Sequence, residues 1–293
     1  MAEDEKAKVA KKKAAKKAAK KAAKKATAAK KAPARKAAAK KTGGVSGYGS
    51  GSVDVVMSVD QVAKEAASIA ANAPKVSELD AMTEGDAFLS INNLRAGYGK
   101  MEILHDFNLR VGRGKSLCLI GPNGAGKSTV LHSIFGFTNI FSGSIVINGK
   151  DVTTLTPSQK LSEAGIAYIL QDKSVFPQMT VEENLLMGGF LKNKPAEAKA
   201  AAELVFSKYS RLADRRDKPA GVLSGGERRL LEISRALVMQ PQVLLVDEPS
   251  IGLEPRFIDM VFEILDDLQH KDGKTIVMVE QNAKKGLAFA DLG

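Results

Sequence analysis

Short, unbroken apolar runs recur along the last two thirds of the chain. Each is only a few residues long, which is typical of strands covered on both faces in a mostly parallel sheet. The runs span residues 117–120, 166–169, 243–246 and 276–279. Ahead of them, residues 88–94 and 103–111 alternate between apolar and polar positions. This alternation predicts a small antiparallel β portion before the parallel sheet.

Apolar residues at helical spacing lie between the predicted strands. The three clearest stripes are Val130, Leu131, Ile134 and Phe135; Leu230, Ile233 and Leu237; and Phe257, Val261, Ile264, Leu265 and Leu268. Strands that alternate with helices predict an α/β fold with a mostly parallel, doubly wound sheet. Helical patterning from about residue 181 to 217 indicates a helical insert.

A polar motif stands at or within two residues of the end of each apolar run. Gly121, Gln171, Asp247 and Gln281 hold these positions in chain order. In open α/β sheets, ligands bind at the carboxyl ends of the strands. The spacing therefore predicts that four distant segments meet in one crevice.

Residues 121–128 read Gly-Pro-Asn-Gly-Ala-Gly-Lys-Ser, between a predicted strand and a predicted helix. The glycines let backbone N–H groups surround phosphate oxygens, and the helix N-terminus adds the positive end of its dipole. This pattern is that of a P-loop that binds ATP, with Lys127 on the β- and γ-phosphates and the Ser128 hydroxyl on Mg²⁺. The expected nucleotide contacts here are Gly121, Pro122, Asn123, Gly124, Ala125, Gly126, Lys127, Ser128 and Thr129.

Asp247 and Glu248 follow the third apolar run as an acidic pair. We expect Asp247, with Ser128 and Gln171, to hold Mg²⁺, and Glu248 to accept a proton from the attacking water. Gln171 and Gln281 are assigned to the catalytic centre with Glu248. A strand-end pair of acids that only forms salt bridges remains the alternative for Asp247 and Glu248.

Tyr98 lies between glycines in the segment Ala-Gly-Tyr-Gly, residues 96–99. Its ring could stack on a nucleobase, and the alternative is a core or hairpin aromatic.

Ser224, Gly225 and Gly226 precede a predicted helix and form a second possible anion cradle. One nucleotide cannot easily use two cradles from one chain, so this predicts that a second subunit presents its cradle to the nucleotide. A simple helix cap is the alternative.

Charge divides the chain into two unlike parts. Residues 1–41 hold 17 basic and 3 acidic side chains, whereas the remainder holds 27 basic and 30 acidic ones. We expect a disordered basic arm at 1–41, a linker with a possible short helix at 42–87, and a globular domain at 88–293. The arm, through residues 6–41, is either a solubilising tail or a contact for anionic lipid or nucleic acid.

Two further features restrict the class of protein. No apolar run approaches the ~18–20 residues of a membrane-spanning helix, and the first residues contain no apolar stretch of a secretory signal. Cys118 is the single cysteine, which excludes an internal disulfide and fits a small buried residue in a reducing compartment.

Taken together, these motifs resemble those of ABC transporter ATP-binding subunits. The matching pieces are Walker A at 121–128, the Q-loop at Gln171, the signature Leu-Ser-Gly-Gly-Glu at 223–227 and Walker B at 243–248. More narrowly, Gly97-Tyr98-Gly99-Lys100, residues 175–184 and residues 279–283 look like the branched-chain amino acid importers. The resemblance implies a P-loop NTPase fold of ABC type, ATP and Mg²⁺, a second ATPase subunit, membrane permeases and a solute-binding protein. It also implies a peripheral location on the cytoplasmic face of the inner membrane.

Three positions depart from the wider family pattern. Gln281 stands where most of the family has histidine, and the branched-chain importers share this glutamine. Glu254 stands where many relatives have aspartate. The chain ends at Gly293, before the last strands expected of such a domain, so we expect some loss of stability. Two other functions stay open: an ABC-type ATPase that acts on nucleic acid or the ribosome, and an ABC exporter of lipid or polysaccharide.

Overall fold

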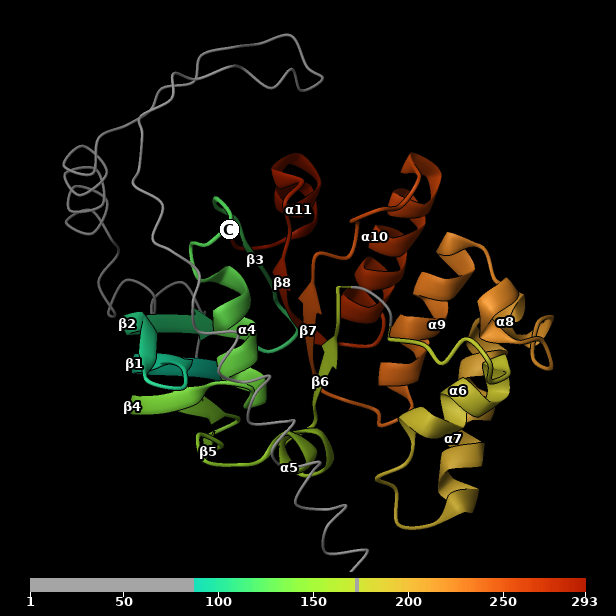
Figure 1. Ribbon diagram of the computed structural model, residues 1–293, viewed down its shortest axis with the longest axis horizontal. Coiled ribbons are helices and arrows are strands. Elements are labelled where there is room, and N and C mark those ends of the chain that lie inside the picture. The colour runs from blue at the N-terminus through green and yellow to red at the C-terminus, as the bar shows by residue number, and fades with distance from the viewer. Residues whose placement is uncertain (1–86, 172–173) are drawn as a thin grey trace, which may run out of the picture. The chain divides into compact units, whose positions relative to one another are not determined.

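The computed structural model describes residues 87–171 and 174–293 (Figure 1). The expected basic arm and nearly all of the expected linker lie outside these residues. The described part contains two sheets, several covering helices and a helical region beside them.

The first sheet is antiparallel, with strand order β2-β1-β4-β5. Its strands are β1 (Leu89–Tyr98), β2 (Met101–Val111), β4 (Asn139–Ile147) and β5 (Lys150–Asp151). The alternating pattern predicted β1 and β2 but not β4, because Ser-Gly-Ser interrupts the apolar alternation of β4. Gly143 lies at that interruption with φ +88°, and an added Cβ would lie 2.4 Å from the Asn93 carbonyl oxygen. The antiparallel sheet is therefore larger than expected, since the chain returns to it after the first helix.

The second sheet is parallel, with strand order β3-β8-β7-β6. Its strands are β3 (Ser116–Leu119), β6 (Ile166–Ile169), β7 (Val243–Asp247) and β8 (Thr275–Val279). The strands β6, β7 and β8 each contain one of the predicted apolar runs, and β3 contains its run except for Ile120. Val243 and Leu245 face one hydrophobic cluster, whereas Leu244 and Val246 face another. Both faces of the sheet are thus buried, which explains why the runs are continuous.

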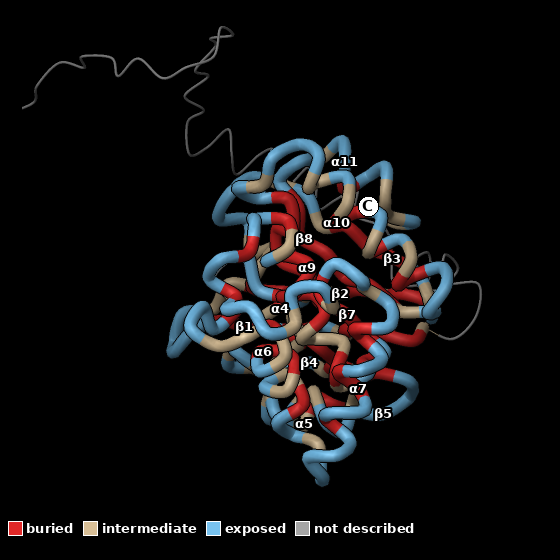
Figure 2. The backbone as a smooth tube through the Cα atoms, turned by 90° about the vertical axis from the view of Figure 1, so that its right-hand side faces the viewer, coloured by how far each residue is buried: buried red, intermediate tan, exposed pale blue. Residues whose placement is uncertain are grey.

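Helices cover both faces of this parallel sheet (Figure 1). The helix α4 (Lys127–Phe135) lies between the two sheets, and α9 (Gly225–Leu237) and α10 (Pro255–His270) lie on the other side. Shorter helices are α5 (Pro157–Ser162) and α11 (Ala283–Phe289). Figure 2 shows that the buried residues gather in the interior, along the central strands and the helices that pack on them. This is the predicted doubly wound α/β arrangement.

A helical region follows β6. It contains α6 (Val181–Gly188), α7 (Pro195–Lys208), α8 (Ser210–Ala213) and the 3₁₀ turn Ala220–Val222. These helices share an apolar cluster with Leu230 and Leu231 of α9. A capping box of Thr180 and Glu183 begins α6. The cluster attaches the helical region to the same helix that begins with the signature residues.

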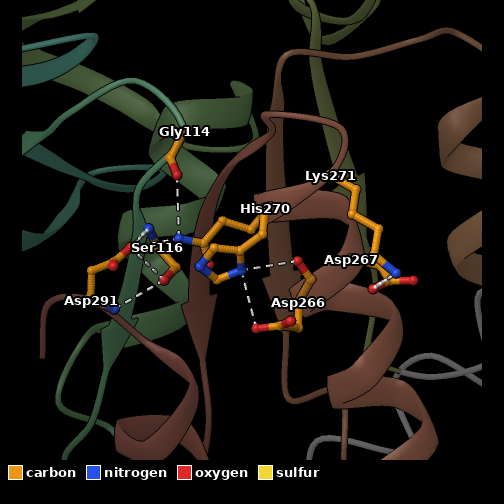
Figure 3. A network of polar contacts seen from close by, with 8 residues as sticks. Gly114, Ser116, Asp266, Asp267, His270, Lys271 and Asp291 are labelled. Carbon is orange, nitrogen blue, oxygen red and sulfur yellow. Dashed lines mark hydrogen bonds and ion pairs between the residues drawn. The ribbon is translucent and has the colours of Figure 1, made fainter.

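Polar contacts join the end of the chain to β3 and to α10 (Figure 3). One oxygen of Asp291 accepts hydrogen bonds from the Ser116 N–H (2.8 Å) and from Gln269 Nε2 (2.5 Å). Gln269 Nε2 also donates to the Gly114 carbonyl at 3.2 Å. Leu292 pairs with the outer edge of β3, where its N–H donates to the Ser116 carbonyl at 3.1 Å. The last described residues are therefore part of the packed domain.

Candidate functional site

The polar residues that follow the four parallel strands meet at one edge of the sheet. Glu248 follows β7 and receives two hydrogen bonds, one from each of two other strand ends. Gln171 Nε2, after β6, donates to Oε2 at 2.8 Å, and Gln281 Nε2, after β8, donates to Oε1 at 2.8 Å. The crevice that the sequence indicated therefore has a carboxylate at its centre, with an amide on each oxygen.

Glu248 is held firmly by the backbone as well as by these amides. It is 8% exposed and has φ +44°, in the left-handed region that non-glycine residues rarely adopt. Its N–H donates to the Val279 carbonyl of β8 at 2.9 Å. Strained backbone of this kind is concentrated at functional sites. The backbone conformation thus helps to orient the carboxylate.

The loop at residues 121–126 leads into α4 without a capping side chain. The N-cap Gly126 has φ +87°, and no acidic residue lies in the first turn. By contrast, α9 is capped by the side chain of Ser224. Lys127 Nζ donates to the carbonyls of Gly121 (2.8 Å) and Pro122 (2.9 Å), so the amine lies over the loop. Uncapped N–H groups and one amine are groups that can bind a phosphate.

Asp247 is buried beside this loop and is hydrogen-bonded on both oxygens. Ser128 Oγ donates to Oδ1 at 3.2 Å, and the Tyr168 hydroxyl donates to Oδ2 at 2.8 Å. Burial raises the pKa of Tyr168, and the nearby Asp247 charge raises it further, so the phenol remains a donor. No role for Tyr168 was predicted, because it lies within an apolar strand and has the pattern of a core residue.

Glu280 is a second residue to which the sequence assigned no role. It is 1% exposed, and Oε1 accepts from Ser250 Oγ (2.8 Å) and from the Asn282 N–H (2.9 Å). These bonds join the segment after β7 to the segment after β8. Glu280 therefore fixes the loop on which Gln281 is presented to Glu248.

Tyr98 lies at the end of β1, next to α4. Its hydroxyl is 2.5 Å from His132 Nδ1, and the residue is 41% exposed. Burial lowers the pKa of His132, although the charge of Asp247 opposes this. Phe135, Phe137 and Tyr168 complete an aromatic group around His132. His132 was another residue missed from sequence, since a lone histidine in an apolar stripe carries no motif.

Ser224, Gly225 and Gly226 lie at the start of α9, away from the phosphate loop. Ser224 and Glu227 form a capping box, so the serine has a local structural role. Gly226 also has one, because an added Cβ would lie 2.2 Å from the Phe257 ring. Gly225 is exposed and has no such neighbour closer than 3.8 Å. Since α4 and α9 pack on opposite faces of the sheet, these cradles do not face one another within one chain.

The other expected nucleotide contacts lie on or next to the phosphate loop. Within it, four residues are exposed: Pro122, Asn123, Gly124 and Ala125. Thr129, in the first turn of α4, is 6% exposed. Glu254, the position that departs from the usual aspartate, is exposed at the start of α10 and lies 3.0 Å from Arg256.

A sequence profile described as ABC transporter matches residues 104–251, just over half of the chain. The chain belongs to the ABC transporter family. This ABC ATPase is 42% identical over 203 residues to the high-affinity branched-chain amino acid transport ATP-binding protein BraG of Pseudomonas aeruginosa, covering 69% of this chain and 86% of the relative. It is 37% identical over 198 residues to the probable branched-chain amino acid transport ATP-binding protein LivF of Archaeoglobus fulgidus, covering 68% and 83%.

Solved structures agree with this assignment. The ADP conformation of an ATP-binding cassette of an ABC transporter matches with a TM-score of 0.63 at 30% identity, covering 71% of this chain and 87% of that one. The predicted ABC-type fold and the narrower resemblance to branched-chain amino acid transport subunits are confirmed. The chain is an ATP-binding and ATP-hydrolysing subunit of the ABC family. Within residues 87–171 and 174–293 of this ABC ATPase, no helix combines the length and the apolar character needed to span a membrane.

Proposed function

We propose that this ABC ATPase binds MgATP at a seam between two ATPase subunits and powers the import of branched-chain or related amino acids. Support for the cargo comes from the relatives that are 42% and 37% identical, both of which are named for branched-chain amino acid transport. Support for the mechanism comes from Glu248, whose two oxygens are each held by a glutamine at 2.8 Å. That contact is the observation on which the proposed chemistry depends.

The phosphates of ATP bind at the start of α4. Lys127 turns from the carbonyls of Gly121 and Pro122 to the β- and γ-phosphates, and the uncapped N–H groups surround the phosphate oxygens. The exposed ring of Tyr98 stacks on the base. Its hydroxyl contact with His132 fixes the ring beside α4.

The residues present also suit Mg²⁺. Ser128 Oγ and Asp247 Oδ1 are 3.2 Å apart, and both are hard oxygen ligands of the kind that Mg²⁺ prefers. The side-chain oxygen of Gln171 provides a third. When bound, Mg²⁺ neutralises charge that develops on the phosphates.

Hydrolysis requires a group that takes a proton from water. The water oxygen attacks the γ-phosphorus, the bond to the bridging oxygen breaks, and ADP leaves with that electron pair. Glu248 accepts the proton of the attacking water. Gln171 and Gln281 orient the carboxylate, and their neutral amides do not compete for the proton.

A second ATPase subunit completes the site. The α9 N-terminus carries Ser224 and Gly225 on the face of the sheet opposite to α4. A partner subunit in inverted orientation would present this end to the γ-phosphate bound on the other chain. The partner is either a second copy or a sibling subunit.

A membrane permease is the second expected partner. A groove of about 340 Å³ lies where β6, α6 and α9 meet. Phe176, Met187 and Phe190 line it and are 44%, 41% and 77% exposed. Exposed aromatic and methionine side chains grouped around a groove are typical of protein interaction sites. This groove supports docking of a permease at the cytoplasmic face of the membrane, where the ATPase is held peripherally, and a solute-binding protein acts on the other side.

Glu248→Gln tests the proposed mechanism, since it keeps the side-chain size and removes the base. We expect ATP turnover to fall at least about 100-fold, as for other general bases, while an ATP-dependent dimer accumulates. Light scattering after gel filtration with MgATP measures the dimer, and Lys127→Ala, which loses phosphate binding, is the control that stays monomeric. Undiminished turnover, or a strictly monomeric variant even with its sibling subunit present, would contradict the mechanism.

The transported solute is tested in proteoliposomes that contain the permeases. Leucine-loaded binding protein should stimulate ATP hydrolysis, whereas unloaded protein should not. Stimulation instead by DNA or RNA, lost when residues 1–41 are deleted, would favour the nucleic-acid function. Stimulation by a lipid or polysaccharide would favour an exporter.

A further inference from the structure

A buried ion pair on α9 lies beside the segment that carries Gln171. Arg229 and Glu232 are 4% and 6% exposed, and Arg229 Nη1 lies 2.8 Å from Glu232 Oε2. The two residues are three positions apart and so share one face of the helix. Charged side chains are rarely buried this fully, which makes the pair unusual.

The pair holds the Gln171 segment at two points. Arg229 Nη1 donates to the Leu170 carbonyl at 2.7 Å, directly before Gln171. The Ser174 N–H donates to Glu232 Oε1 at 3.3 Å, and Arg235, one turn further along α9, donates to the Ser174 carbonyl. Three residues on one helix face thus tether the backbone on both sides of Gln171.

Stability alone does not account for this pair. Burying two charges removes their hydration, and a packed apolar pair of similar volume is often at least as stable. Within the described residues, Arg229 Nε and Nη2 are buried without a hydrogen-bond partner, so the guanidinium is only partly compensated. The arrangement is therefore better explained by what it positions.

Gln171 borders an open space. A cavity of about 520 Å³ is bordered by Gln171, Gly225, Arg229, Glu232 and Leu253. Packing on that side does not confine the exposed glutamine, whose amide must nevertheless stay on Glu248. Its neighbour Leu170 is held by the hydrogen bond from Arg229 that is described above.

We propose that Arg229 and Glu232 are positioning residues, which hold Gln171 on Glu248 and transmit displacement of the α9 N-terminus to that carboxylate. The inference rests on the proposed role of Glu248. Gly225 and Arg229 are four residues apart, about 6 Å along a rigid helix. Engagement of Ser224 and Gly225 by nucleotide on a partner subunit would therefore move the Leu170 carbonyl, and Gln171 with it. The position of Gln171 in one subunit thus depends on the nucleotide that is bound to the other subunit.

The double variant Arg229→Met/Glu232→Leu removes the tether and keeps the buried volume. In the full chain we expect kcat to fall about tenfold, the lower end for groups that orient a catalytic residue from outside the reacting atoms, with KM for ATP within about twofold. Binding contacts at Lys127 and Ser128 are untouched, which is why KM is spared. Arg229→Lys, which keeps the positive charge and an N–H donor at the end of the side chain, should retain at least half of kcat.

Arg216→Met is the matched control. Arg216 bridges Glu182 and Glu203, both of the helical region, so the kcat of this variant should equal that of the parent. If the Met/Leu variant unfolds, Arg229→Gln/Glu232→Gln replaces it, with the same expected result. Unchanged kcat in a folded double variant overturns the proposed tether. The proposed function is judged separately, and it stands if Glu248→Gln is inactive. An equal rise in KM and fall in kcat, or no rescue by lysine, indicates a structural role and also overturns it.

Discussion

Replacing Gln281 by leucine should slow ATP hydrolysis about tenfold without weakening ATP binding. The change leaves an apolar side chain of comparable bulk, one atom shorter, and removes the amide that donates to Glu248 Oε1 at 2.8 Å. Glu280 and the backbone around it should keep the loop in place, because their contacts do not involve the Gln281 side chain.

The expected size of the effect follows from the contact. A hydrogen bond to a charged group contributes about 1.5–3 kcal/mol, which corresponds to a factor of about 10–150 in rate. Gln171 still holds the other oxygen of Glu248, and Gln281 is exposed to solvent that can replace its N–H. We therefore expect the lower end of the range, with KM changed by less than about twofold, since the amide contacts the base and not the phosphate loop.

Steady-state phosphate release over a range of MgATP concentrations measures both constants. Gln281→Glu is the isosteric comparison, and it should be slower than the leucine variant at neutral pH. A second carboxylate at this distance would raise the pKa of the pair, so that one of the two acids stays protonated. A leucine variant whose kcat is within twofold of the parent would refute the view that Gln281 orients the base.

The remaining predictions concern stability and reactivity. Burial alone would raise the pKa of Asp291, but hydrogen bonds from Ser116 and Gln269 outweigh it, so the folded pKa is lowered. The contribution of Asp291 to the free energy of unfolding is therefore present above about pH 4, the pKa of an aspartate in the unfolded chain. It is lost as the pH falls through the folded pKa. Asp291→Asn should lower the unfolding free energy by about 1 kcal/mol at pH 7, after allowance for its exposure, and urea titrations at pH 7 and pH 3 should show the difference shrinking; a constant difference would contradict this. Burial, together with the charge of Glu280, raises the pKa of Cys118 to about 11, so at pH 8 the native thiol should react roughly 200-fold more slowly than an exposed one. Equal labelling rates in native and urea-unfolded protein would show that β3 opens readily.

The sequence by itself determined the parallel strands and the chemistry at their ends. Each buried strand is a contiguous apolar run, and the phosphate loop is a contiguous motif, so both can be recognised without knowledge of distant residues. The order of polar residues after the strands also predicted one crevice, because parallel strands bring their carboxyl ends to the same edge. The contacts of Gln171 and Gln281 with Glu248 are consistent with that expectation.

Only the tertiary structure decided which partners those residues have. Tyr168 donates to Asp247 from 79 positions away, and Arg229 reaches Leu170 across 59 positions. Neither residue stands in a local motif, since its role depends on which helix or strand packs beside it. The need for glycine at position 226 likewise comes from the Phe257 ring on another helix. Local sequence specifies the elements and their chemical groups, whereas long-range packing selects the neighbour of each group and so the geometry of the site.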